Sequence, residues 1–143
     1  MARLRFATPA LLFLLAGCPE GLLGPGHQPL DFSWSPAGHG EWLEEPEVVA
    51  GGGEGTIQVE ARLSAPNPCQ SLTGQAERSG QDWVLRVRIV GGGGACTAQI
   101  GTFEYLAVIG DLPADEYSLQ VVHEYPGTGW VSGPVLEERI PVR

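Results

Sequence analysis

The sequence predicts an all-β fold, an antiparallel β-sandwich of about seven strands, and three observations predict it. Apolar and polar residues alternate with period two in most segments after residue 55, as in strands with one buried face. Turn-forming glycine and proline recur at spacings of roughly ten residues, which is typical of sandwiches. No segment shows the apolar stripe of an amphipathic helix. The expected strands cover residues 57–63, 72–78, 83–89, 96–100, 103–109, 117–123 and 135–142.

The segments 57–63 and 83–89 carry the clearest strand pattern. In the first, every odd position is isoleucine, valine, alanine or leucine, and every even position is polar or charged. In the second, Trp83 and the odd positions after it are apolar, whereas Arg86 and Arg88 lie between them. The turn Ser79-Gly80 separates this strand from a shorter one at 72–78. Both patterns indicate a face that packs into a core.

The later strands follow the same rule, with one change of parity. Cys96, Ala98 and Ile100 share one face, whereas the apolar residues from Phe103 to Ile109 occupy the other parity. We expect a β-bulge or strand break at Gly101-Thr102, because one extra residue reverses the faces of a strand. Residues 117–123 and 135–142 complete the sandwich.

The composition before residue 55 indicates a tether. Residues 18–54 are acidic and rich in glycine and proline, with Gly51-Gly52-Gly53 as a flexible stretch. Part of this segment, near residues 41–50, is apolar enough to form an irregular edge or a short strand. The expected organisation is residues 1–17 as a signal, 18–54 as the tether and 55–143 as the sandwich domain.

The N-terminus has the parts of a secretory signal. Arg3 and Arg5 precede an apolar run that ends at Leu15-Ala16-Gly17-Cys18. The run of roughly 12 residues spans about 18 Å as a helix, too short for a bilayer core of about 30 Å. These four residues resemble the lipobox of bacterial lipoproteins. The resemblance implies cleavage after Gly17, acylation of Cys18 and a membrane-anchored protein of the bacterial cell envelope that faces the periplasm or the exterior.

The charge of the mature chain excludes several partners. Removal of Arg3 and Arg5 with the signal leaves six arginines and no lysine against 17 acidic residues, a formal charge of −11. Such a surface does not favour nucleic acid or a polybasic contact with membrane lipids. We expect the membrane to be reached through acylated Cys18 alone, and an envelope protein or component to be the partner.

Cys69 and Cys96 are the cysteines that remain once Cys18 is assigned to lipid. An even remainder in an exported chain indicates a disulfide. The alternative is two free or metal-binding thiols, but a zinc site would need a CxxC pair or a nearby histidine.

The segment Leu112-Pro113-Ala114-Asp115-Glu116-Tyr117 resembles the tyrosine corner of fibronectin type III and immunoglobulin-like domains. In such domains, a tyrosine that opens the penultimate strand donates a hydrogen bond to the backbone a few residues upstream. The resemblance implies this role for Tyr117, with Leu112 and Pro113 shaping the turn. It implies an immunoglobulin- or fibronectin III-like sandwich and no function.

The sequence contains no recognisable catalytic set. None of His27, His39 and His123 belongs to an HExxH pattern, and no GxSxG nucleophile motif is present. Gly91–Gly94 lacks the GK[ST] of a phosphate-binding loop, and the glutamates near residue 44 lack the spacing of a calcium loop. We therefore predict no enzyme, no cofactor and no metal. The alternative is a hydrolase or metal-dependent enzyme that uses His123.

The loop 124–130 is the candidate binding loop. Loops at the end of a sandwich often carry binding residues, and Tyr125 and Trp130 would offer large contact areas at low entropic cost. The alternative is that both side chains pack on the edge of the sandwich. The function expected from these observations is a lipid-anchored, non-catalytic binding protein, or else a structural spacer or accessory domain of an envelope assembly.

Overall fold

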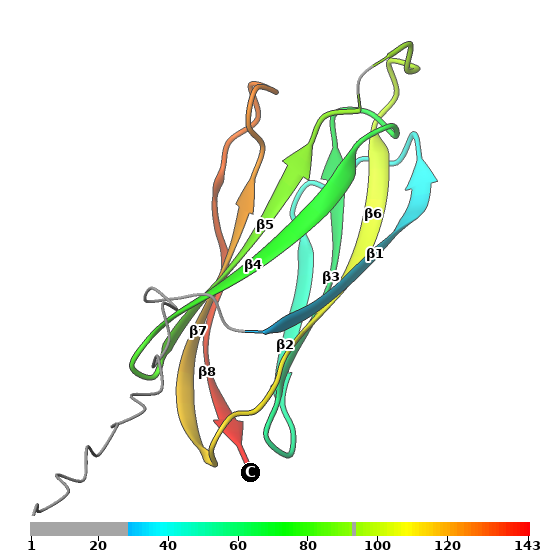
Figure 1. Ribbon diagram of the computed structural model, residues 1–143. Coiled ribbons are helices and arrows are strands. Elements are labelled where there is room, and N and C mark those ends of the chain that lie inside the picture. Colours follow the sequence, from blue (N-terminus) through cyan, green and yellow to red (C-terminus); the bar gives the residue numbers. More distant parts are fainter. Residues whose placement is uncertain (1–28, 93) are drawn as a thin grey trace, which may run out of the picture.

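Two four-stranded sheets packed face to face make up the described part of the protein (Figure 1). A computed structural model describes residues 29–92 and 94–143, and these residues contain strands and no helix. The all-β sandwich is confirmed, with eight strands in the described residues rather than about seven. The strands are β1 (Leu30–His39), β2 (Glu47–Gly52), β3 (Ile57–Ala65), β4 (Ser71–Ser79), β5 (Asp82–Val90), β6 (Gly101–Ile109), β7 (Asp115–Glu124) and β8 (Gly133–Val142).

The sandwich begins well before residue 55. The predicted signal 1–17 and Cys18 lie outside the described residues, but from Leu30 onward the expected tether forms strands β1 and β2. The tether prediction is therefore wrong for the residues of β1 and β2, whereas the short edge strand expected near residues 41–50 corresponds to β2. β1 owes its place to pairing with β6 from Leu30↔Ile109 to His39↔Gly101, and its Phe32 ring packs on Tyr105. Because these strands contain glycine, proline and serine, their amino-acid composition does not predict that they pair in a sheet.

The strand order departs from the expected immunoglobulin-like arrangement. The first sheet, in the order β1-β6-β3-β2, is antiparallel throughout. In the second, in the order β4-β5-β7-β8, strands β5 and β7 are parallel, whereas both sheets of an immunoglobulin domain are antiparallel. The wholly antiparallel prediction is thus wrong for one pair. The cause is β6, which crosses to the other sheet between β5 and β7 and brings the chain back to the end where β5 began.

The core lies between the sheets and matches the predicted alternation. Odd-numbered residues of β3 and β5 face inward, as do Tyr117, Leu119 and Val121 of β7. The prediction was wrong for residues 96–100, which form a loop. β6 begins at Gly101, so the change of parity marks the start of a strand rather than a bulge. A Cβ at Gly101 would stand 2.7 Å from Pro68 Cα, so only glycine fits there.

Strands β1, β3, β5 and β7 all run toward one end of the sandwich, at the top in Figure 1. That end, here called the loop end, carries the connections 40–46, 66–70, 91–100 (apart from residue 93) and 125–132. Leu30, where β1 starts, pairs with Ile109 at the opposite end. The described chain therefore enters the fold at the end remote from these loops.

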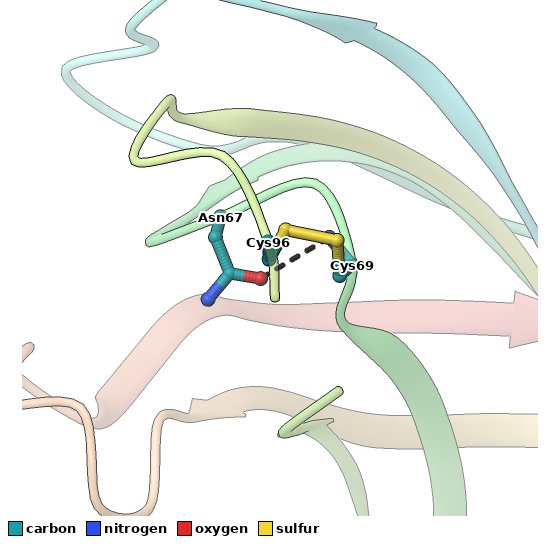
Figure 2. Close-up of a disulfide and its surroundings, with 3 residues drawn as sticks. All are labelled: Asn67, Cys69 and Cys96. Carbon is teal, nitrogen blue, oxygen red and sulfur yellow. Dashed lines mark hydrogen bonds between the residues drawn. A yellow bond between two sulfur atoms is a disulfide. The ribbon is translucent and has the colours of Figure 1, made fainter. Parts of the chain in front are cut away.

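The predicted disulfide between Cys69 and Cys96 is confirmed, and it joins two loops at the loop end (Figure 2). The Cα atoms are 6.0 Å apart. The Asn67 side-chain oxygen accepts a hydrogen bond from the Cys69 amide at 3.1 Å, which orders the turn before the bond. The cystine thus ties the β3–β4 connection to the β5–β6 connection.

Candidate binding site at the loop end

The connection between β1 and β2, residues 40–46, is fixed to the body of the sandwich on both sides of Trp42. The Gly40 amide donates to the Ile100 carbonyl at 2.8 Å, and the Thr102 hydroxyl donates to the Glu41 carbonyl at 3.3 Å. On the other side, the Leu43 amide donates to Ser64 Oγ at 3.0 Å. The backbone is thus held in place, yet the Trp42 side chain remains 54% exposed.

The facing wall is the β7–β8 loop, residues 125–132, which hydrogen-bonds to itself. The Tyr125 amide donates to Ser132 Oγ at 2.8 Å. The Thr128 hydroxyl donates to the Tyr125 carbonyl at 2.8 Å and accepts from the Trp130 amide at 3.1 Å. Gly127 and Gly129 supply the positive φ angles, 72° and 78°, that this turn requires. The loop is preorganised.

Three aromatic side chains meet between these walls and form the aromatic cluster, Trp42, Tyr125 and Trp130. Trp42 packs edge-on against Trp130 with ring centroids 5.0 Å apart, and Trp130 lies 5.5 Å from Tyr125. Exposure rises outward, from Tyr125 at 9% through half-buried Trp130 to Trp42. The neighbouring Val131 is 90% exposed.

The candidate loop residues therefore play different parts. Tyr125 packs inward, as in the alternative reading, whereas Trp130 links it to a tryptophan that sequence reasoning did not select. Trp42 lies 88 residues before Trp130 in the chain, and no local pattern signals their contact. The only available signal was a large apolar residue in a segment that otherwise looked like tether.

A pocket of about 460 Å³ opens between the two walls, within the usual range of roughly 300–1,000 Å³ for small-ligand sites. Trp42, Trp130 and Val131 line its outer part, and His123 and Ser64 line it from the sheets. Glu44 is the charged residue on its wall. The pocket combines an apolar surface with a few polar groups, the composition typical of binding sites.

His123 is at the buried side of this pocket. Its side chain is 1% exposed, and Nε2 lies 2.9 Å from the Tyr105 hydroxyl across the two sheets. Burial lowers the pKa of His123 to about 4, so the imidazole is neutral near pH 7. Burial, together with the nearby Tyr125, raises the pKa of Tyr105 far above its ordinary value. Nδ1 has no hydrogen-bond partner among the described residues.

The tyrosine corner lies at the opposite end. The Tyr117 hydroxyl donates to the Pro113 carbonyl at 2.9 Å, the bond expected from the motif. Leu112 is buried beside it, and its amide donates to the Gly55 carbonyl at 3.0 Å. These residues fasten the β6–β7 turn and take no part in the pocket.

The described residues contain neither a cluster of metal-binding side chains nor a helix that could cross a membrane. Within residues 29–92 and 94–143, His, Cys, Asp and Glu side chains form no group of three that could hold a metal ion. In the same part of the chain, no helix is long and apolar enough to cross a membrane.

The two packed sheets define the chain as carrying a β-sandwich domain. Residues 59–129, just under half of the chain, match the family model of the ORF11 beta-sandwich domain. No curated protein and no solved structure was found to match the chain. The matched segment contains the disulfide and the Tyr105–His123 pair, but Trp42 and Trp130 lie outside it.

Proposed function

We propose that the protein is a lipid-anchored lipoprotein of the bacterial cell envelope whose sandwich carries a non-catalytic binding site at its loop end. The observation that carries the binding role is the exposure of Trp42 and Val131 on two loops whose backbones are fixed by hydrogen bonds. Large apolar side chains grouped on a rigid concave surface are typical of interaction sites.

Rigidity supports binding because a fixed loop loses little conformational entropy when a partner docks. The aromatic side chains provide contact area with few rotatable bonds. His123 supports a non-catalytic role, since its hydrogen-bond partner is the Tyr105 phenol and not the carboxylate that orients a catalytic histidine.

The direction of the chain fits an anchor at Cys18. β1 starts at Leu30, at the end opposite the pocket. An acylated Cys18 would therefore hold the protein from the side on which the chain enters the sandwich, and the aromatic cluster would be free to meet a partner in the periplasm or outside the cell. Two or three acyl chains suffice for stable anchoring without a membrane-spanning helix.

Intact mass spectrometry of the protein purified from membranes tests the anchor. The expected chain begins at Cys18 and carries added acyl mass, and a Cys18→Ala protein leaves the membrane fraction. An unmodified chain that begins at Met1, or a Cys18→Ala protein that stays with membranes, would contradict the anchor.

A spacer or accessory domain is the second candidate, and the burial of Tyr125 favours it. A host strain that carries Trp42→Ala and Val131→Ser together distinguishes the two roles. If the domain is a binding protein, the double variant stays folded and anchored but no longer supports the wild-type phenotype of the host strain. If the domain is a spacer, the wild-type phenotype is kept. The matched control is Val49→Ser, which changes an equally apolar residue, 71% exposed, on β2.

A further inference from the structure

We propose that the loop-end pocket binds a basic segment of a protein partner and takes up one arginine or lysine side chain, with Glu44 as the counter-ion and Trp42 and Trp130 against its aliphatic stem. This inference rests on the proposed binding function and adds the chemistry of the partner.

The charges around the pocket favour a cation. Glu44 lines the pocket and neither arginine nor lysine does. Glu41 is already paired with Arg62 at 2.9 Å, whereas Glu44 and Glu45 form no ion pair within the described residues. The mature chain has a formal charge of −11, so an anionic ligand or a second copy of this chain would be repelled at this surface.

The aromatic cluster suits the rest of such a side chain. Lysine and arginine lay their methylene stems along apolar surfaces while the charged group stays at a polar site. A cation is also attracted to the face of tryptophan. Trp42 is the most exposed member of the cluster and lies two residues before Glu44 in the same fixed loop, and both line the pocket. The segment from Trp42 to Glu44 therefore gives the pocket both an apolar wall and a carboxylate.

His123 supplies an independent sign of a ligand. Buried polar atoms nearly always have a hydrogen-bond partner, yet Nδ1 of His123 has none among the described residues, although the ring is 1% exposed and lines the pocket. The neutral ring can accept a hydrogen bond at Nδ1 when Nε2–H donates to the Tyr105 oxygen. An arginine, with five N–H donors, can supply that bond and also pair with Glu44.

The four tryptophans of the chain make the test specific. The detergent-solubilised full chain, labelled with 5-fluorotryptophan, is titrated with two blocked pentapeptides that differ in the central residue, arginine in one and its neutral isostere citrulline in the other. Fluorine NMR signals are assigned by single Trp→Phe variants. The arginine peptide is expected to move the signals of Trp42 and Trp130 and to leave Trp34 and Trp83 unchanged. Citrulline is expected to bind about fivefold more weakly.

Glu44→Gln isolates the counter-ion. It should lower the affinity for the arginine peptide by about fivefold, to that of the citrulline peptide. Glu45→Gln, which removes the same charge from the next residue without touching the pocket, should have a smaller effect. Both residues are exposed, so both variants are expected to fold.

Several outcomes would overturn the proposal. The two peptides could bind equally well, or the fluorine signals of Trp42 and Trp130 could stay unchanged with the arginine peptide. The same signals could instead shift with a neutral chitooligosaccharide. A shift with protein concentration alone would indicate self-association. Binding of both peptides with equal affinity would refute the basic partner while leaving the binding function in place. The acyl mass on Cys18 is measured separately, so failure of the anchor would not be confused with either result.

Discussion

The Tyr105 hydroxyl and His123 Nε2 lie 2.9 Å apart and join β6 of one sheet to β7 of the other through a buried hydrogen bond. Both side chains are almost fully buried, so the bond forms in an apolar environment where a charged imidazole is strongly disfavoured. The pair therefore couples the packing of the two sheets to the protonation of one histidine.

The stability of the fold should decrease below about pH 6.5 because of His123. Its pKa is lowered from 6.5 to about 4 in the folded protein, so between these values the unfolded chain binds the additional proton. The stabilising contribution of neutral His123 is fully present above the pKa of the unfolded chain. It is lost as the pH falls to about 4, which lowers the free energy of unfolding by about 3 kcal/mol. Chemical denaturation at several pH values measures it.

The wild-type curve is compared with that of His123→Gln, so that the effect of this one histidine is isolated. That variant should be less stable at pH 7 and show a shallower pH dependence. His39→Gln, which alters an exposed histidine, should keep the wild-type slope. Equal slopes for wild type and His123→Gln would refute the role of His123, and Tyr105→Phe provides a second variant that should fold with the ring packing intact.

Phe32 and Gly74 close one edge of the sandwich, where β1 meets β4. A Cβ on Gly74 would overlap the Phe32 ring, with Cγ at 2.6 Å. Gly74→Ala should therefore cost about 1–3 kcal/mol in the free energy of unfolding. Gly51→Ala is the control, because a Cβ there meets nothing within 4 Å. In a double-mutant cycle, Phe32→Ala should remove the Gly74→Ala penalty, and strictly additive effects would speak against the overlap.

At the end of the sandwich opposite the loop end, the hydrogen bond of the tyrosine corner should make a smaller contribution to stability than the fit of Gly74 against Phe32. Tyr117→Phe removes the hydrogen bond to the Pro113 carbonyl and keeps the buried ring. The expected loss is about 1 kcal/mol in the free energy of unfolding. Tyr125→Phe also removes one hydroxyl, but that hydroxyl has no side-chain hydrogen bond in the described residues, so its loss should be smaller. A larger loss of stability for Tyr125→Phe than for Tyr117→Phe would show that the hydrogen bond of the corner is not important for stability.

The parts of this fold that sequence reasoning found are those encoded by neighbouring residues. Trp83 to Ile89 alternate because one face of β5 is buried, and the corner joins Tyr117 to Pro113, only four positions earlier in the chain. β1 was missed because its order comes from β6, about 70 residues later. The parallel pairing of β5 with β7 was missed because alternation is the same whichever way a strand runs.

In the candidate site, too, the features that neighbouring residues encode could be predicted, whereas contacts between distant segments could not. Tyr125 and Trp130 lie in a loop whose composition marks it as a candidate, but their environment depends on Trp42, from a loop that joins two strands of the other sheet. His123 has the parity of the inward-facing residues of the predicted strand 117–123, and it is buried with them. Its cross-sheet partner, Tyr105, could not be inferred because the relative position of two sheets is set by packing over many residues.

The disulfide should contribute about 3–4 kcal/mol, since it closes a loop between residues 27 apart in the chain. Denaturation with and without a reductant measures this difference, and alkylation followed by mass spectrometry shows when the thiols become accessible. Cys69→Ser with Cys96→Ser should reproduce the reduced protein. Unchanged stability after complete reduction would contradict the prediction.

Two adjacent glycines test how tightly the cystine is packed. A Cβ on Gly92 would overlap the backbone carbonyl of Cys69, whereas a Cβ on Gly91 meets nothing within 4 Å. Because the obstacle is backbone held by the disulfide, Gly92→Ala must displace the β3–β4 loop, at a cost of about 1–3 kcal/mol. Gly91→Ala should change the free energy of unfolding by less than about 0.5 kcal/mol. Breaking the cystine frees that loop to move, so the penalty of Gly92→Ala should shrink in the Cys69→Ser, Cys96→Ser background. A penalty of the same size in both backgrounds would mean that the disulfide does not hold the Cys69 carbonyl against residue 92.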